Sequence, residues 1–286
     1  MSLSEPRTLA PFGRRMLAVA ERRELGAYVV LAADDPGGPI PRAGQFYMLA
    51  AEREWGGRDD GRPFLPRAFS VLRARAAGPA EGAAGPAEDA AGPRLEFMLE
   101  AVGPGTERLC ELRPGEGLHV TGPLGIGFPD PPDARRALLC GGGVGTAPLA
   151  IWQDELLAGG QPAPALLGFR DAAHAPGATL LQNARVATDD GSHGHHGLVT
   201  DLLDAELDAD DHVVVYACGP PPMLEAVRAL CEARGVPSRL ALESGMACGF
   251  GACFGCVVAL RDGGYARLCV DGPVLDGALL AEVPAP

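Results

Sequence analysis

The chain has 286 residues and a formal net charge of −13. This length predicts about two domains with room for a small third, and the acidic charge, with no basic run to offset it, argues against nucleic acid as a partner. All 24 cationic side chains are arginine, which excludes a P-loop lysine and Schiff-base chemistry.

Export and membrane signals are missing from the sequence. Residues 1–11 are polar and charged, unlike the apolar centre of a signal peptide. No apolar run approaches the roughly 18 residues that a membrane span needs. We therefore expect a cytoplasmic protein, in which the eight cysteines are thiols or metal ligands.

The first part of the chain predicts an antiparallel β-barrel. Short apolar runs alternate with Gly/Pro turns, a rhythm typical of antiparallel strands, and about six strands form an economical closed barrel. The expected strands are residues 16–20, 28–32, 46–50, 68–72, 95–99 and 117–121. Residues 76–93 repeat Ala-Ala-Gly-Pro-Ala-Glu; because Gly-Pro breaks helices, we expect a flexible hairpin insert, with partner binding as the alternative.

After residue 130 the pattern of apolar residues changes and predicts alternating strands and helices. Strands are expected at 137–140, 165–169 and 213–217, and helices at 147–157, 199–203 and 222–234. Such alternation predicts a parallel sheet with crossover helices. We therefore expect a multidomain protein: a β-barrel domain over 8–130, an α/β nucleotide domain over 131–240 and a small cysteine-rich domain over 241–286.

Four cysteines crowd into the last domain, at positions 248, 253, 256 and 269. Their spacing, C-x4-C-x2-C followed by a distant fourth cysteine, is that of plant-type [2Fe–2S] ferredoxins. Glycines between them leave room for a tight loop around the cluster. Zinc, which prefers two separated pairs of close cysteines, and ordinary buried thiols are the alternatives.

Two loops are candidate nucleotide sites. Residues 140–148 read Cys-Gly-Gly-Gly-Val-Gly-Thr-Ala-Pro, and residues 216–223 read Tyr-Ala-Cys-Gly-Pro-Pro-Pro-Met. Each follows an expected strand and precedes an expected helix, where backbone N–H groups can meet a pyrophosphate. Alone, the first loop is equally compatible with a plain strand-to-helix turn. The second loop supports the nucleotide interpretation, because both loops follow parallel strands and therefore open on the same ligand-binding edge of the sheet.

These loops and the string Arg67-Ala68-Phe69-Ser70 occur in an order that resembles the ferredoxin–NADP reductase superfamily. With the cysteine cluster, the chain is similar to the electron-transfer subunits of class 1B dihydroorotate dehydrogenases. The similarity includes residues 103–106 (Gly-Pro-Gly-Thr), 122–125 (Gly-Pro-Leu-Gly), 188–192 (Thr-Asp-Asp-Gly-Ser), 243–249 (Glu-Ser-Gly-Met-Ala-Cys-Gly) and 271–274 (Asp-Gly-Pro-Val).

The resemblance implies FAD, a [2Fe–2S] cluster and NAD as cofactors. It places Arg67 on the FAD pyrophosphate, which a guanidinium fork suits, and Ser70 near the flavin N5 edge. The remaining implied FAD contacts are Ala68, Phe69, Met98, Leu99, Glu100, Gly105 and Thr106. The implied NAD contacts are Gly143, Gly145, Thr146, Cys218, Gly219 and Pro220, and the implied iron ligands are Cys248, Cys253, Cys256 and Cys269.

Several of these residues have a plainer interpretation. Arg67 taken alone is a surface arginine, and Cys218 taken alone is a small core residue. Glu243 is the candidate for the late acidic residue of the superfamily, close to the flavin. Glu100 stands where the family usually carries arginine, so we expect its side chain to point away from the FAD phosphates.

The expected function is electron transfer from a partner FMN-containing dihydroorotate dehydrogenase subunit, through the cluster and FAD, to NAD+, in an assembly of two copies of each subunit. Arg170 would suit NADP and Asp171 would oppose it, which favours NAD. Two rivals remain: a related subunit for a hydrogenase or a ferredoxin:NADP transhydrogenase, and a zinc-stabilised binding module. The histidines at 193, 195 and 196 suggest a solvated loop, with metal binding as the alternative.

Overall fold

A computed structural model describes residues 14–56, 62–76 and 92–283. Its first half is a seven-stranded antiparallel sheet in the order β4-β3-β7-β1-β2-β6-β5, one strand more than expected. The strands are β1 (Arg15–Leu25), β2 (Tyr28–Asp34), β3 (Phe46–Ala51), β4 (Arg67–Ser70), β5 (Arg73–Ala76), β6 (Pro93–Glu100) and β7 (Gly117–Leu124), with helix α1 (Pro104–Cys110) between the last two.

The sheet curls into a barrel because one short segment joins its two edges. Val71 N donates to Gln45 O beside β3, and Leu72 N donates to Glu96 O on β6. The expected strand at 68–72 is therefore split into β4 and β5, one at each edge. Ala76 of β5 pairs with Pro93 of β6; most of the insert expected at 76–93 lies outside the described residues.

The second half is a sheet in the order β11-β10-β9-β8-β12-β13-β16. Its pairs are parallel, except that β16 runs antiparallel to β13. The strands are β8 (Arg136–Gly142), β9 (Ala165–Phe169), β10 (Ala184–Thr188), β11 (His195–His196), β12 (Val213–Cys218), β13 (Ser238–Ala241) and β16 (Val274–Asp276). Strands β10, β11, β13 and β16 are absent from the sequence prediction.

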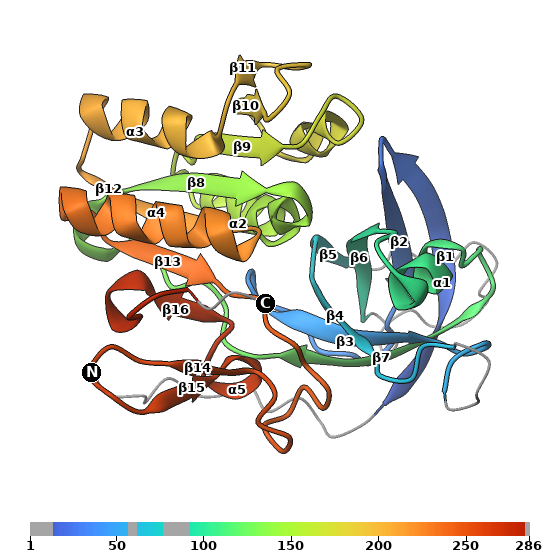
Figure 1. The fold of residues 1–286 in the computed structure, drawn as a ribbon. Coiled ribbons are helices and arrows are strands. Elements are labelled where there is room, and N and C mark those ends of the chain that lie inside the picture. Colours follow the sequence, from blue (N-terminus) through green and yellow to red (C-terminus); the bar gives the residue numbers. More distant parts are fainter. Residues whose placement is uncertain (1–13, 57–61, 77–91, 284–286) are drawn as a thin grey trace.

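Three helices cover this sheet. Helices α3 (Val199–Ala209) and α4 (Pro221–Arg234) lie on one face and α2 (Thr146–Ala158) on the other (Figure 1). Helix α4 ends where Gly235 takes the left-handed conformation, φ 66°, which glycine adopts without strain. Among the described residues, no helix is long and apolar enough to cross a membrane.

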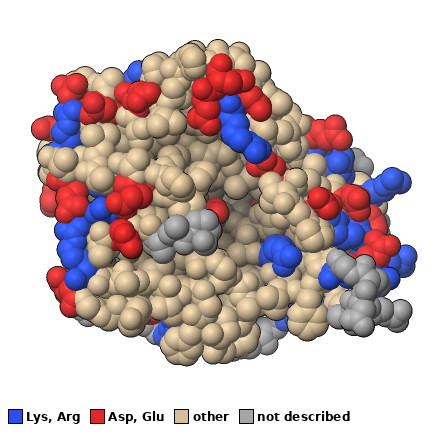
Figure 2. All heavy atoms as spheres, in the orientation of Figure 1, with Lys and Arg blue, Asp and Glu red and all other residues tan. Residues whose placement is uncertain are grey.

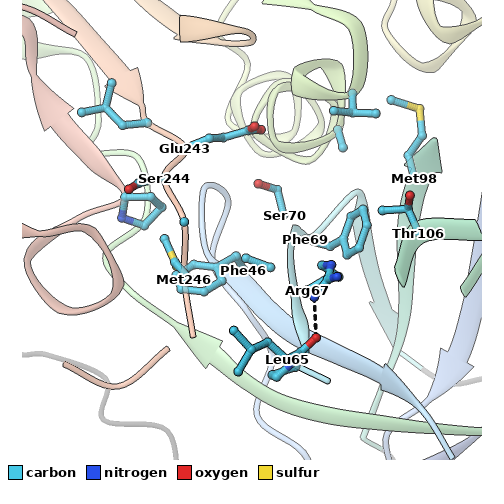
Figure 3. A pocket seen from close by; sticks show the side chains of 17 residues that line it. Phe46, Leu65, Arg67, Phe69, Ser70, Met98, Thr106, Glu243, Ser244 and Met246 are labelled. Carbon is cyan, nitrogen blue, oxygen red and sulfur yellow. Dashed lines mark hydrogen bonds between the residues drawn. The ribbon is translucent and has the colours of Figure 1, made fainter. Parts of the chain in front are cut away.

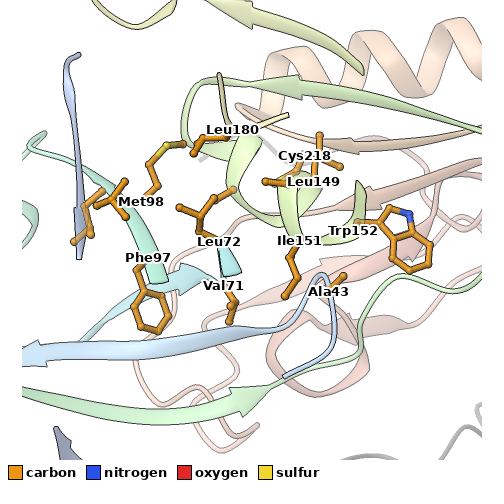
Figure 4. Packing of buried hydrophobic residues seen from close by; sticks show 14 of the residues in the cluster. Ala43, Val71, Leu72, Phe97, Met98, Leu149, Ile151, Trp152, Leu180 and Cys218 are labelled. Atoms are coloured by element: carbon orange, nitrogen blue, oxygen red, sulfur yellow. The ribbon is translucent and has the colours of Figure 1, made fainter. Parts of the chain in front are cut away.

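One apolar core joins the barrel to α2 (Figure 4). Val71, Leu72 and Phe97 of the barrel belong to the same buried cluster as Ile151 and Trp152 of α2. Continuous burial of this kind holds the two halves in a fixed relation, which positions any site between them.

The cysteine-rich segment contains β14 (Val257–Ala259), β15 (Tyr265–Arg267) and α5 (Leu268–Asp271). It returns to the second sheet through β16, and Leu242 N donates to Pro273 O. Arg261 Nη1 also lies 2.6 Å from Glu232 Oε1 of α4. This segment is thus tied to the nucleotide-domain sheet and is not an independent core.

We expect Asp35→Ala to destabilise the barrel by about 3–5 kcal/mol, the usual cost of stranding one partner of a buried ion pair. Asp35 is fully buried and its two carboxylate oxygens lie 2.8 and 2.7 Å from Arg15 nitrogens. The measurement is urea-induced unfolding followed by barrel tryptophan fluorescence. Asp34→Ala, at the exposed neighbouring position, should change stability by about 0.5 kcal/mol or less; equal effects at both positions would contradict the prediction.

Candidate functional site

A first cavity of about 420 Å³ opens between the barrel and the segment that leads into the cysteine loop (Figure 3). The barrel side contributes the whole string from Arg67 to Ser70, with Met98 and Thr106. The other side contributes Val144, Ala147 and the run from Leu242 to Met246. Of the sequence-predicted FAD contacts, the structure gathers Arg67, Ala68, Phe69, Ser70, Met98 and Thr106 here.

Arg67 supplies positive charge to this cavity. Its Nη1 group donates to Leu65 O at 2.6 Å, and its guanidinium lies 5.8 Å from the centroid of the Trp55 ring. Among the described residues Arg67 has no carboxylate partner. A Cβ atom at Gly105 would come within 2.6 Å of Arg67 Nε, so glycine at 105 leaves space for the guanidinium. The charge is therefore available for an anion.

Of the predicted FAD contacts, Leu99, Glu100 and Gly105 do not line this cavity, and Thr106 lines it with a hydroxyl that is already hydrogen-bonded. Leu99 is fully buried in the barrel core, because its side chain points to the face of β6 opposite Met98. Thr106 Oγ1 accepts hydrogen bonds from the backbone N–H groups of Val102 and Gly103 and donates to Gly103 O. Its hydroxyl thus caps α1 and contributes mainly shape to the cavity.

A second cavity, of about 540 Å³, lies along the carboxyl edge of the parallel sheet. Both predicted nucleotide loops line it, through Gly143 on one and Gly219 and Pro220 on the other. The barrel contributes Tyr28 and Glu100. This is the edge at which open α/β sheets bind ligands, and Figure 2 shows a hollow in this face of the molecule.

The two loops touch each other at Gly145. A Cβ atom there would meet Cys218 O at 2.3 Å, so only glycine permits this approach. Cys218 is buried, which raises the pKa of its thiol well above the usual value. Gly145, Thr146 and Cys218, which the resemblance implies as NAD contacts, do not line either cavity. Thr146 Oγ1 is fully buried and has no hydrogen-bond partner among the described residues.

Glu100 points toward the second cavity, on the side of the nucleotide domain. Its carboxylate pairs with the guanidinium of Arg170 and lies 3.3 Å from His174 Nε2. It does not line the first cavity, where Arg67 lies.

Glu243 lines both cavities, as does Val144. The side chain is exposed within the cavities, and desolvation by the protein around them raises the pKa of its carboxyl. A carboxyl group so placed can hold a proton at the junction of the two cavities.

The four clustered cysteines form two pairs. Cys256 Sγ and Cys269 Sγ are 3.3 Å apart, and the Cys253 thiol hydrogen-bonds Cys248. Within the described residues no three His, Cys, Asp or Glu side chains are placed to hold a single metal ion. Two thiol pairs match a cluster of two irons that each take two thiolates.

Backbone N–H groups surround the first pair. Burial alone would raise the pKa of Cys248, but hydrogen bonds from Phe250, Cys253 and Ala252 lower it to about 7. Burial, with the hydrogen bond from Cys256, raises the pKa of Cys269 to about 12. Amide groups directed at sulfur are the donors that stabilise cluster thiolates, so the loop fits the predicted cluster.

The histidine loop has an ordinary surface environment. His195 and His196 are exposed on β11, and His195 Nε2 lies 3.3 Å from Asp201 Oδ2. His193 accepts a hydrogen bond from Thr188 Oγ1 through its carbonyl.

Sequence reasoning missed several cavity residues. Tyr28 and His174 line the second cavity, and neither belongs to a string with a recognisable spacing. Asp189 and Met246 also line the cavities; they lie in strings that carry the resemblance, but the sequence assigns them no role. The aromatic contact between Tyr28 and His174, with ring centroids 5.5 Å apart, joins the two halves and appears only in the folded chain.

The chain is similar to proteins of known family. Residues 243–281 match the family model for the iron–sulfur cluster binding domain of dihydroorotate dehydrogenase B. An electron transfer subunit of dihydroorotate dehydrogenase B (NAD(+)) from Caldanaerobacter subterraneus is 34% identical over 83% of this chain and 86% of its own length. The corresponding subunit from Bacillus caldolyticus is 43% identical over 60% of this chain and 68% of its own.

Solved structures share the fold. An NADH-dependent reduced ferredoxin–NADP oxidoreductase superposes with a TM-score of 0.73 at 23% identity, covering 95% of this chain and 92% of that one. A ferredoxin NADP+ reductase from Neisseria gonorrhoeae with bound FAD and NADP gives 0.57 at 16% identity, over 78% and 92%. The predicted barrel, parallel sheet and cluster domain are confirmed. From its match to the relatives, the chain belongs to the family of electron transfer subunits of dihydroorotate dehydrogenase B (NAD(+)).

Proposed function

We propose that this chain passes electrons from a partner dihydroorotate dehydrogenase subunit that carries FMN, through a [2Fe–2S] cluster and FAD, to NAD+. The observation that carries the proposal is the position of the first cavity. Glu243 and Val144 join it to the second cavity, and Met246 on its wall is two residues before Cys248. Three cofactor sites would thus lie in series.

The side chains fit the proposed groups. Arg67 would bind the FAD phosphates, with Ser70 and Phe69 beside the flavin ring, and Cys248, Cys253, Cys256 and Cys269 would ligate iron. Gly143, Gly219 and Pro220 would let the dinucleotide approach the sheet edge, and Gly145, Thr146 and Cys218 would hold the loops behind it. An iron–sulfur cluster carries one electron at a time, whereas a nicotinamide accepts a hydride. A bound flavin can do both, so it would connect the two.

The residues of the chain would position and shield these groups. Met98, Phe46 and Met246 line the first cavity with apolar surface, which keeps water from the reacting edge. Glu243, whose pKa is raised by desolvation between the cavity walls, can hold a proton where the cavities meet. We further propose domains at 8–130, 131–240 and 241–286, and an assembly of two copies of each subunit.

The test is reconstitution with the partner subunit. The isolated chain should show flavin and [2Fe–2S] absorbance and reduce an artificial acceptor with NADH, without oxidising dihydroorotate. Adding the FMN subunit should produce dihydroorotate-dependent NAD+ reduction. Dihydroorotate turnover by the chain alone, or a colourless protein that contains zinc and no iron, would overturn the proposal.

A further inference from the structure

The second cavity has few positive charges. Among its described lining residues, Arg170 and His174 are the two that can carry one, and Glu100, Asp189 and Glu243 are the carboxylates. Among the described lining residues, Arg170 and His174 are therefore the side-chain cations open to an anionic group that lies away from the backbone N–H groups of the two loops.

Both of these side chains already have acidic partners. The Glu100 carboxylate contacts the Arg170 guanidinium and lies 3.3 Å from His174 Nε2. Asp171 Oδ1 lies 2.7 Å from His174 Nδ1. The positive charge at this end of the cavity is therefore compensated before any ligand arrives.

The compensating charge comes from the other domain. Glu100 is the last residue of β6, directly opposite Tyr28 on β2, whereas Arg170 and His174 follow β9. The Tyr28 ring meets the His174 ring edge-on, at 77°. The barrel thus holds a carboxylate against a loop of the nucleotide domain.

This arrangement bears on the difference between the two nicotinamide dinucleotides. The 2′-phosphate of NADP needs a free cation, and an arginine fork is its usual partner, whereas a carboxylate accepts the ribose hydroxyls of NAD. With Glu100 in place, a 2′-phosphate would have to displace a carboxylate from Arg170 and then lie beside it.

We propose that Glu100, a residue of the flavin barrel, selects NAD over NADP by neutralising Arg170 across the boundary between the domains. This inference rests on the proposed function, because it takes the second cavity to be the dinucleotide site.

The experiment compares NADH and NADPH as donors to an artificial acceptor, using the whole flavin-loaded chain. Glu100→Gln should raise kcat/KM for NADPH relative to NADH by about 10- to 100-fold, the range of a charge-assisted contact to phosphate. Adding Arg170→Ala to Glu100→Gln should remove this gain. Glu96→Gln, on the same strand but paired with Arg23 outside both cavities, should leave the ratio unchanged.

Two results would overturn the inference: a ratio in Glu100→Gln within about twofold of the unaltered chain, or a gain that survives Arg170→Ala. Flavin content is measured for every variant, so that an altered FAD site is not mistaken for altered selectivity. Failure of the proposed function looks different: either the unaltered flavin-loaded chain oxidises no nicotinamide dinucleotide at all, or it oxidises NADH but gives no dihydroorotate-dependent NAD+ reduction with the FMN subunit.

Discussion

Cys256→Ala should abolish dihydroorotate-dependent NAD+ reduction by the assembled complex while sparing the NADH-driven reduction of an artificial acceptor. Cys256 Sγ lies 3.3 Å from Cys269 Sγ in a buried pair, and removing one thiolate leaves an iron without half of its protein ligands. We expect iron and acid-labile sulfide to be lost and complex turnover to fall by about 100-fold or more, because the remaining groups cannot take electrons from the partner.

The matched control is Cys231→Ala. Cys231 is as buried as Cys256 and lies on α4, outside the cysteine loop. The substitution therefore removes a buried sulfur atom in both variants, but a proposed iron ligand in only one of them. This variant should keep its cluster and its turnover, with a stability loss of about 1–2 kcal/mol from the small cavity. Flavin content separates loss of the cluster from loss of the fold. A Cys256→Ala protein that retains iron, sulfide and turnover would contradict the assignment of this cysteine.

The sequence predicts those parts of the site that depend on short strings. The spacing of the four cysteines follows from how tightly a loop must wrap a cluster, and Arg67 to Ser70 occupy one strand edge, so both appear as local patterns. Glu100, Arg170 and His174 are different. Glu100 lies 70 residues before Arg170 and 74 before His174 in the sequence. These side chains come into contact only because the barrel packs against α2.

The same distinction explains the missed strands. β13 has four residues and β16 three, too short for a periodic signal to rise above chance. Their pairing also crosses the expected boundary at residue 240, since β16 belongs to the cysteine-rich segment and β13 to the nucleotide domain. A short antiparallel edge strand supplied by a distant segment is fixed by tertiary contacts.

Arg67→Ala should weaken FAD binding by about 10- to 150-fold, the equivalent of about 1.5–3 kcal/mol for a charged hydrogen-bonded contact. The guanidinium lines the first cavity and has no carboxylate partner among the described residues, so no other group would be left uncompensated by its removal. The measurement is the dissociation constant of FAD from flavin fluorescence. Arg94→Ala, on β6 and paired with Glu21, is the matched control and should bind FAD normally.

Gly105→Ala tests the same site without touching the charge. The added Cβ would approach Arg67 Nε to 2.6 Å and must push the guanidinium from its place, so FAD affinity should fall although the arginine is still present. Arg67→Lys should lie between these variants and the unaltered chain, because it keeps the charge but loses the two-pronged geometry. If Arg67→Ala binds FAD normally while Gly105→Ala does not, the backbone at 103–106, and not Arg67, holds the phosphates.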